Sequence, residues 1–290
     1  MPTYATPEPI AVTLEVAGDQ VVIAAGDRAD TTVRVGPADT SNSADTKAVE
    51  RTEVDFTDGE LLVRTPQLHG LKGLVGAVGS VAIRIELPAG SSLTATATHA
   101  ALRAEGALGE CRVETAGGRV ELDRTGTLQA ATSEGDLVVG HVAGGADIDG
   151  ASGSIRIHRI DGGGAIQSAS GALWIGHAAG ELNLSTANGE ILVDRADAGV
   201  SAVTADGSIR IGRLRQGKAE LMTATGNVEV GIAEGSAAWI DAQSKTGSVR
   251  NSLAVHDGPG DFERTVEVRA HTHSGDVVVH RAGRPGTEQE

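Results

Sequence analysis

A glycine that recurs about every 18 residues constrains this chain more than any other feature of its sequence. Nine glycines follow one another from Gly118 at spacings of 17, 18, 18, 18, 18, 19, 21 and 28 residues, and Ala100 occupies the same slot 18 residues earlier. A fixed period of this length is typical of architectures in which similar units stack on one another. The glycines stand at positions 118, 135, 153, 171, 189, 207, 226, 247 and 275.

Each repeat contains two segments in which apolar and variable residues alternate. After the glycine, the second and fourth positions are aliphatic, as in Ile155 and Ile157, while the position between them varies freely, as at Arg156. A second alternating segment precedes the glycine, with Leu182 and Leu184 as examples of its inward residues. Alternation with a period of two predicts strands with one buried face. Each repeat is therefore expected to form a rung of two short strands.

The repeats predict an all-β fold, an elongated β-solenoid of about ten two-stranded rungs, because a single rung cannot bury its own apolar face. Residues 91–282 are predicted to be the repeat domain, residues 1–90 a β-rich capping segment, and residues 283–290 a polar tail. A solenoid exposes an edge strand at its end, so a cap is needed there. Asp58-Gly59 predicts a hairpin turn within the cap, and Ala44–Glu50 is a candidate helix.

A hydroxyl side chain stands three residues before most of the repeated glycines. At such a corner, a hydroxyl can satisfy backbone groups of the turn or stack with its neighbours in a ladder. The hydroxyl residues are Thr115, Thr132, Ser168, Thr186, Thr204, Thr223, Ser244 and Thr272.

Composition narrows the possible functions. The 290 residues include 40 glycines and five aromatic residues, and such a chain is expected to have a thin aliphatic core. A net charge of −15 argues against binding to nucleic acid or to anionic membranes. The single cysteine, Cys111, excludes an internal disulfide and falls in an inward slot, where core packing is the expected role.

A basic side chain stands six residues after most of the repeated glycines. Stacked at rung spacing, these residues would form a stripe of positive potential, which could bind an acidic peptide, a polyanionic polymer or a row of carboxylates. The alternative is that they are solvated turn residues paired with acids such as Asp123 and Asp194. This basic ladder comprises Arg124, His141, Arg159, His177, Arg195 and Arg213, with Arg281 beyond two broken rungs.

Other candidate sites are weaker. His271 and His273 share one face of a predicted strand and His280 is near, but no clear further ligand completes a metal site, so neither metal nor cofactor is expected. Trp174 occupies an outward slot and is a candidate contact residue, whereas Trp239 is expected to pack near a repeat insertion. The chain shows no Ser-His-Asp, phosphate-loop or dinucleotide signature, so it is not expected to be an enzyme.

The repeat also resembles a known family. Pro-Glu-Pro-Ile at 7–10, Ile-Glu-Leu-Pro at 85–88 and the recurring Thr-Ala-x-Gly-x-Ile-x-Ile units are similar to the putative-adhesin, or toastrack, β-strand-repeat family, a domain of unknown function. The resemblance covers nearly the whole chain. It implies an elongated β fold and a role in adhesion or envelope-associated scaffolding.

Together these patterns predict a non-enzymatic binding, scaffold or adhesin-like protein whose partner is a protein or an acidic polymer. The alternative is a carbohydrate-binding or carbohydrate-processing β-helix, although sugar binding usually uses exposed aromatic residues and this chain has five aromatics in all. Residues 1–9 lack the pattern of a signal peptide, and no apolar run has the length of a membrane span. A cytoplasmic location is therefore expected, or an extracellular or envelope-associated one if the adhesin label applies.

Overall fold

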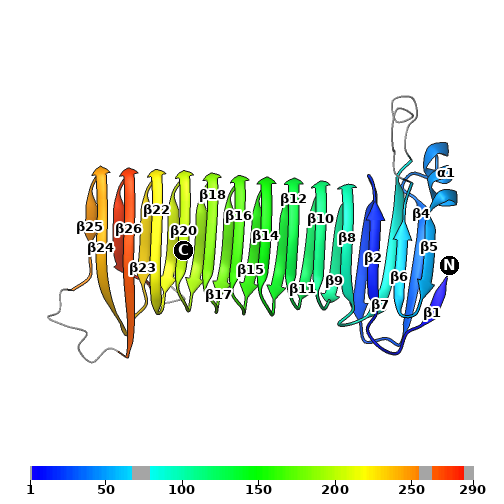
Figure 1. Cartoon of the computed structure of the whole chain (residues 1–290), viewed down its shortest axis with the longest axis horizontal. Coiled ribbons are helices and arrows are strands. Elements are labelled where there is room, and N and C mark those ends of the chain that lie inside the picture. The colour runs from blue at the N-terminus through cyan, green and yellow to red at the C-terminus, as the bar shows by residue number, and fades with distance from the viewer. Residues whose placement is uncertain (1, 67–78, 255–262, 284–290) are drawn as a thin grey trace, which may run out of the picture. The chain divides into compact units, whose positions relative to one another are not determined.

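The computed structural model describes residues 2–66, 79–254 and 263–283. The chain forms two compact units, Met1–Gly144 and Gly145–Glu290, called unit 1 and unit 2 below. Each is built almost entirely from β-strands (Figure 1). The predicted polar tail lies outside the described residues apart from Gly283.

Unit 1 contains thirteen strands and the helix α1 among its described residues. Their bounds are β1 (Thr3–Ala5), β2 (Ala11–Val16), β3 (Gln20–Gly26), β4 (Asp30–Pro37), α1 (Ser43–Arg51), β5 (Glu53–Thr57), β6 (Glu60–Arg64), β7 (Val81–Pro88), β8 (Ser92–His99), β9 (Ala101–Ala107), β10 (Cys111–Gly117), β11 (Val120–Thr125), β12 (Leu128–Glu134) and β13 (Leu137–Val142).

Unit 2 contains fourteen strands among its described residues. Their bounds are β14 (Ala146–Ser152), β15 (Ile155–Ile160), β16 (Gly164–Ser170), β17 (Leu173–Ala178), β18 (Leu182–Asn188), β19 (Ile191–Ala196), β20 (Val200–Asp206), β21 (Ile209–Leu214), β22 (Gly217–Thr225), β23 (Val228–Ile232), β24 (Ser236–Thr246), β25 (Val249–Asn251), β26 (Arg264–Ser274) and β27 (Val277–Arg281).

The rungs stack in parallel, as the 18-residue period predicts. In unit 2, Ile155 lies opposite Leu173, which lies opposite Ile191, so equivalent slots of successive repeats are in register in one sheet. The strands that precede the glycines form the second sheet with the same register, as in the pairing of Leu182 with Val200. The all-β solenoid fold of two-stranded rungs is therefore confirmed within each unit.

The core lies between the two sheets and consists of aliphatic side chains from the predicted inward slots. Ile157, Ile175, Leu221 and Val230 are all 0% exposed. Outward residues between them, such as Arg156, are exposed. This confirms the two-residue alternation, and it shows how a chain poor in aromatic residues still buries a continuous apolar core.

Most rung corners carry glycine, and Gly171 shows two reasons for it. Gly171 has a φ of +131°, in a region that residues with a side chain rarely adopt. A Cβ atom at Gly171 would also collide with the carbonyl oxygen of Gly153, the equivalent glycine of the preceding rung. The repeated glycine therefore permits both the turn and the close stacking of one corner on the next.

Several of the corner hydroxyls satisfy turn backbone groups, as expected, although Thr186 Oγ1 is buried without a hydrogen-bond partner among the described residues. Thr223 Oγ1 donates to the Gly207 carbonyl at 2.9 Å, and Thr272 Oγ1 donates to the Gly226 carbonyl at 2.9 Å. Both side chains are 6% exposed. A buried polar group without a partner is costly, so this bond explains why an alcohol is tolerated at a position facing the interior.

The order of the rungs departs from the sequence order at one end of each unit. In unit 1, β2 pairs with both β8 and β6, and β3 pairs with both β9 and β7, so the β2/β3 rung lies between two rungs that follow it in sequence. In unit 2, β26 pairs with both β22 and β24, and β27 with both β23 and β25. The β26/β27 rung is thus inserted between the two rungs that precede it.

Three antiparallel strand pairings close one end of unit 1. The β5–β6 hairpin turns at Asp58 and Gly59, which have φ values of 51° and 81°, and β4 pairs with β7 and β1 in the other sheet. The predicted hairpin is confirmed, and α1 contains the predicted helix Ala44–Glu50. Because the parallel pairing includes segments on both sides of residue 91, the division into a cap and a repeat domain remains a prediction.

Candidate binding surfaces

The structure aligns the basic ladder within each unit. In unit 1, Arg124 lies opposite His141. In unit 2, Arg159 lies opposite His177, and His177 lies opposite Arg195. Arg213 comes directly before Leu214, which pairs with Ala196, so it continues the same row.

The aligned charges of the ladder in unit 2 are largely compensated by acids. Asp161 accepts from Arg159 at 2.7 Å, and Asp197 contacts His177 Nε2 at 2.9 Å and Arg195 Nε at 3.3 Å. Burial of Asp197 opposes its ionisation, but the hydrogen bond to His177 and the charge of Arg195 outweigh it, so its pKa lies below the ordinary value. The ladder is therefore a chain of ion pairs more than a bare positive stripe, and its role in binding remains a prediction.

The acidic residues close to the ladder in sequence differ in how closely they pair with its arginines. Arg124 Nε lies 3.8 Å from an oxygen of Asp123, which matches the alternative expected for this residue. The principal partners in unit 2 are instead Asp161 and Asp197, each two residues after an arginine of the ladder. Arg281, beyond the broken rungs, donates to the carbonyls of Ala233 and Ser236 at 3.1 and 2.7 Å and so supports a turn.

The outward face of the other sheet of unit 2 carries exposed apolar side chains. Val203 is 38% exposed and Met222 is 47% exposed, and the two lie opposite each other on β20 and β22. Two residues further along the same strands, Ala205 and Ala224 are also exposed. We refer to Val203, Ala205, Met222 and Ala224 as the apolar patch.

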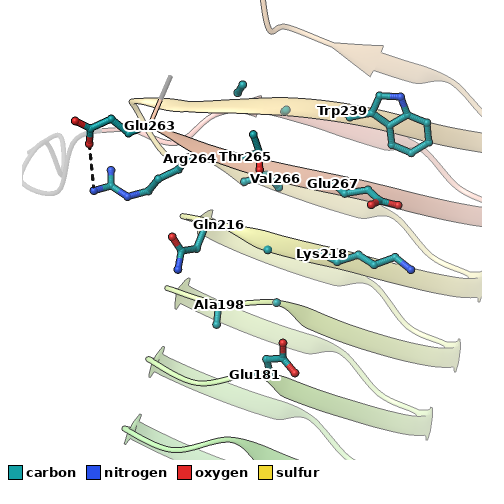
Figure 2. Close-up of a pocket in the computed structure, with 14 residues that line it drawn as sticks. Glu181, Ala198, Gln216, Lys218, Trp239, Glu263, Arg264, Thr265, Val266 and Glu267 are labelled. Atoms are coloured by element: carbon teal, nitrogen blue, oxygen red, sulfur yellow. Dashed lines mark ion pairs between the residues drawn. The ribbon is translucent and has the colours of Figure 1, made fainter. Parts of the chain in front are cut away.

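A groove lies on the same sheet of unit 2, towards the N-terminal ends of its longer strands (Figure 2). Its volume is about 970 Å³. Trp239 on β24, Glu267 on β26 and Lys218 on β22 line it in one row across the strands. We call it the Trp239 groove. Its lining is completed by Glu181, Ala198, Gly199, Gln216, Gly217, Ala237, Ala238, Glu263, Arg264, Thr265 and Val266.

Trp174 occupies the expected outward slot, whereas Trp239 differs from its expected position. Trp174 is half-buried: the His158 ring meets it edge-on at 4.9 Å, and the Arg156 guanidinium lies 5.8 Å from its ring centre. Trp239 was expected to pack near the repeat insertion, and that expectation is wrong, because the side chain is 57% exposed. It stands in an outward slot between Ala238 and Ile240 on a strand at the edge of its sheet.

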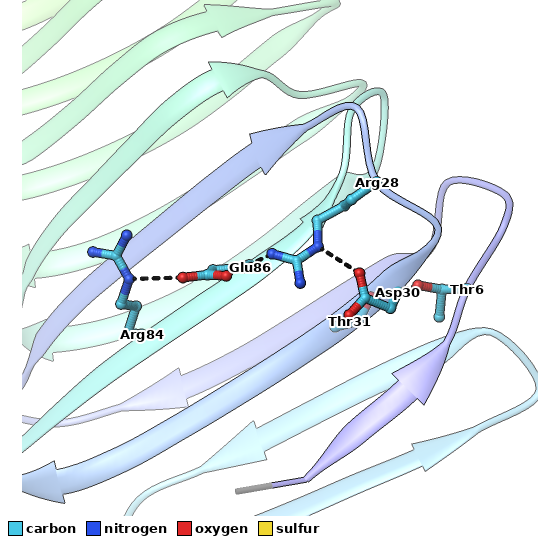
Figure 3. Close-up of polar contacts among 6 residues, drawn as sticks. All are labelled: Thr6, Arg28, Asp30, Thr31, Arg84 and Glu86. Atoms are coloured by element: carbon cyan, nitrogen blue, oxygen red, sulfur yellow. Dashed lines mark hydrogen bonds and ion pairs between the residues drawn. The ribbon is translucent and has the colours of Figure 1, made fainter.

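A cluster of charged residues joins two strands of unit 1, β4 and β7, and the turn that precedes β4 (Figure 3). Arg28 donates to Glu86 at 2.6 Å and to Asp30 at 3.0 Å, and Arg84 donates to the second oxygen of Glu86 at 3.1 Å. The hydrogen bonds from Arg28 and then Arg84 lower the pKa of Glu86 to about 2. This cluster, which sequence reasoning missed, ties β4 to β7.

The described residues contain no group of three or more His, Cys, Asp or Glu side chains that could hold a metal ion. His280 instead contacts Glu229 at 3.0 Å, and His271 lies 3.7 Å from Asp241. Cys111 is 0% exposed, and burial together with the charge of Glu110 raises the pKa of its thiol to about 12. Its expected role in core packing is confirmed.

The parallel two-stranded rungs and their glycine corners define a β-strand-repeat protein. The model of the Toastrack DUF4097 family matches residues 11–280, and the chain belongs to this family. No curated protein matches the sequence. No helix in the described part of the chain is long and apolar enough to span a lipid bilayer.

Solved structures with a similar fold have low sequence identity to this chain. A putative adhesin from Parabacteroides distasonis is 11% identical, with 96% of this chain and 95% of that chain covered and a TM-score of 0.41. A putative adhesin from Parabacteroides merdae is 14% identical, with 96% and 94% covered and a TM-score of 0.42.

Proposed function

We propose that this chain is a non-enzymatic, adhesin-like binding protein, and that the apolar patch of unit 2 is the surface on which it receives a protein partner. The observation that carries the proposal is the direct pairing of Val203 and Met222 on an outward sheet face, with both side chains in contact with solvent. Grouped apolar side chains on a protein surface are a feature of interaction sites.

The character of the patch favours a protein over other partners. Ala205 and Ala224 are small and uncharged, so the surface on their side of Val203 and Met222 lacks charge, whereas Glu220 and Arg269 lie on the other side. Methionine adapts its shape to a contacting surface, as at other protein-binding sites. A membrane surface would require basic residues, whereas the chain carries a net charge of −15.

The ladder is the competing surface. Arg159 and Arg195 already have partners in Asp161 and Asp197, and binding an acidic polymer there would require these pairs to be replaced. Exposed ion pairs are individually weak, so the exchange is feasible but gains little free energy. The apolar patch needs no such exchange, which favours it as the partner surface.

The test is capture of partners from native extracts, including the envelope fraction, by the immobilised chain. A double variant, Val203→Glu with Met222→Glu, is compared with a ladder variant, Arg159→Glu with Arg195→Glu and Arg213→Glu. Gln167→Glu, on an exposed position of β16 in the same sheet, is the matched control for added charge. Circular dichroism and thermal melting establish that all variants are folded.

Loss of a specific captured protein with the patch variant, and its retention with the ladder and control variants, is the expected result. Loss with the ladder variant alone would assign binding to the basic ladder and contradict the patch. Identical capture by all four proteins would exclude both surfaces. A chemical change in a captured small molecule or polymer would contradict the non-enzymatic assignment.

A further inference from the structure

The Trp239 groove has the form of a ligand site and lies apart from the apolar patch along the strands. β24 and β26 begin two residues further out than β22 does, since Ser236 pairs with Arg264 and Gly217 pairs with Val266. β20 begins at Val200, which pairs with Ala219, so it is shorter still at this end. The longer strands therefore form a ledge above the turns that precede β18 and β20 (Figure 2).

Small residues keep the floor of this groove open. Gly199 lies where a side chain would otherwise stand beside Lys218: an added Cβ would lie 3.0 Å from the Lys218 carbonyl oxygen. Gly217 has a φ of +94°, and a Cβ there would lie 2.8 Å from the Gly199 nitrogen. The resulting volume of about 970 Å³ is at the upper end of the range typical of small-molecule sites, about 300–1,000 Å³.

The indole of Trp239 is available to a ligand. The other tryptophan, Trp174, is held between His158 and Arg156, whereas Trp239 has no ring or cation contact with the described residues and is 57% exposed. A large aromatic face in water beside an open groove costs free energy unless it is covered. This asymmetry between the two tryptophans is the strongest indication of a site.

The polar side chains around the groove match hydroxyl groups better than a single charged group. Glu267 lies between Trp239 and Lys218 in the row, and its carboxylate pairs along the strand with Arg269 at 2.8 Å. Lys218 pairs in the same way with Glu220. These groups retain further hydrogen-bonding capacity as acceptors and donors, but their charges are already balanced.

The charge of the lining excludes anionic ligands. Glu181, Glu263 and Glu267 outnumber Lys218 and Arg264, and Arg264 lies 3.8 Å from Glu263. Phosphate recognition uses uncompensated arginine, lysine or a helix N-terminus, none of which lines this groove. A fatty chain would cover the polar groups of Glu181, Gln216 and Lys218 without hydrogen-bonding to them, which costs free energy.

We propose that the Trp239 groove is a carbohydrate-binding site for a neutral oligosaccharide of pyranose units. The apolar C–H face of one sugar ring stacks on the Trp239 indole, and the hydroxyls of that ring and its neighbours bond to Glu267, Lys218, Gln216 and Glu181. This inference is independent of the protein partner assigned to the apolar patch.

The test uses the fact that the chain has two tryptophans. Trp174→Phe leaves Trp239 as the sole indole, and its fluorescence is followed during titration with cellotetraose, maltotetraose, mannotetraose and chitotetraose. Calorimetry on the wild type, Trp174→Phe and Trp239→Ala measures affinity independently. Trp174→Phe is the matched control, because it removes a tryptophan from an outward slot in the other sheet.

At least one of these neutral sugars is expected to give a saturable blue shift of Trp239 emission. Its Kd should rise at least about ten-fold in Trp239→Ala, equivalent to a lost stacking contact, and stay unchanged in Trp174→Phe. No response to any sugar, or equal affinity in Trp239→Ala, would overturn the proposal. Tighter binding of oligogalacturonate would overturn its charge argument. A dimer that Trp239→Ala dissociates, without sugar binding, would make the groove an interface between copies.

Discussion

The end of unit 1 and the end of unit 2 differ in how they cover the last rung of the stack. In both, the rung nearest the chain terminus is inserted one place inward, and the rung outside it lies further from that terminus in the sequence. Unit 1 then adds antiparallel strands, β5 in one sheet and β4 with β1 in the other. In unit 2, β24 and β25 are the edge strands of the described residues.

The exposure of the inward side chains shows the consequence of this difference between the two ends. The outermost parallel strand of unit 1, β6, has Leu61 and Val63 at 0% exposure. In β24 of unit 2, the inward residues Ala238 and Ile240 are half-buried, and Val249 on β25 is 45% exposed. A stack of identical rungs can continue indefinitely, so an end is sealed only when the strand direction changes and side chains cover the last rung.

Aromatic residues and a buried acid complete the closed end of unit 1. The rings of Tyr4 and Phe56 stack at 4.6 Å and join the first strand to the β5–β6 hairpin. Asp19 is 3% exposed, and its carboxylate accepts bonds from Ala17 N at 3.0 Å, Thr65 Oγ1 at 2.7 Å and Val81 N at 2.9 Å. One side chain thus fixes the ends of three segments.

The largest expected difference between the two ends concerns their core residues. Leu61→Ala in unit 1 should lower the free energy of unfolding by about 3–4 kcal/mol, because it opens a cavity in a sealed core. Ile240→Ala in unit 2 should cost only about 1 kcal/mol, since solvent already reaches this side chain. Denaturant unfolding of both variants measures the difference. Equal losses would show that the end of unit 2 is covered as well as that of unit 1.

A smaller effect is expected from the buried acid. Asp19→Ala should destabilise the protein by about 2–3 kcal/mol, because Val81 N and Thr65 Oγ1 lose a buried acceptor. Asp19→Asn, which keeps one acceptor oxygen, should lose less. Hydrogen exchange at β2, β3 and β7 should accelerate in Asp19→Ala while β24 and β26 keep their rates. Uniform acceleration along the chain would contradict a local role for Asp19.

The smallest expected effect is a dependence on pH. The pKa of Glu86 is about 2 in the folded chain, against an ordinary value of 4.5, so its ion pairs stabilise the fold above pH 4.5 and are lost as the pH falls towards 2. In unit 2, hydrogen bonds from Ser248, then the charge of Arg250, lower the pKa of Asp276 in the same direction. Unfolding is measured from pH 7 to pH 2 for the wild type, Glu86→Gln and Asp276→Asn.

The stability gap between the wild type and each variant should close over that acid range. Both carboxylates are partly exposed, with 26% of the Glu86 side chain and 39% of the Asp276 side chain accessible. The gap should therefore be modest and should shrink in high salt. A gap that widens on acidification would show that the sign of the pKa shift is wrong. A gap for Glu86→Gln without one for Asp276→Asn would sharpen the contrast between the two ends.

The repeating part of the fold could be predicted because each rung carries its own signals. The glycine marks the corner, and the aliphatic pair marks the buried face, so register followed from counting residues. The same argument placed Arg159, His177 and Arg195 in one row. It did not show that Asp161 and Asp197 would compensate them, because these acids recur only on alternate rungs.

The order of the end rungs could not be predicted, because every rung offers the same apolar pattern to both neighbours. Val268 on β26 is opposite Ala219 on one side and Ile240 on the other, and either contact would bury it equally well. The only trace in the sequence is the 28-residue spacing before Gly275. Trp239, by contrast, could have been placed correctly, since the alternation puts it between the inward residues Ala238 and Ile240.

The inserted rungs have a mechanical consequence. Tension on the chain termini reaches β27 directly and β2 once β1 has detached, and each of these strands has hydrogen-bonded neighbours on both sides. Neither strand can be removed from a free edge one hydrogen bond at a time. Its backbone hydrogen bonds to both neighbouring strands must break together. In single-molecule pulling, we therefore expect the first major event to need more force than removal of β24 or β5 would.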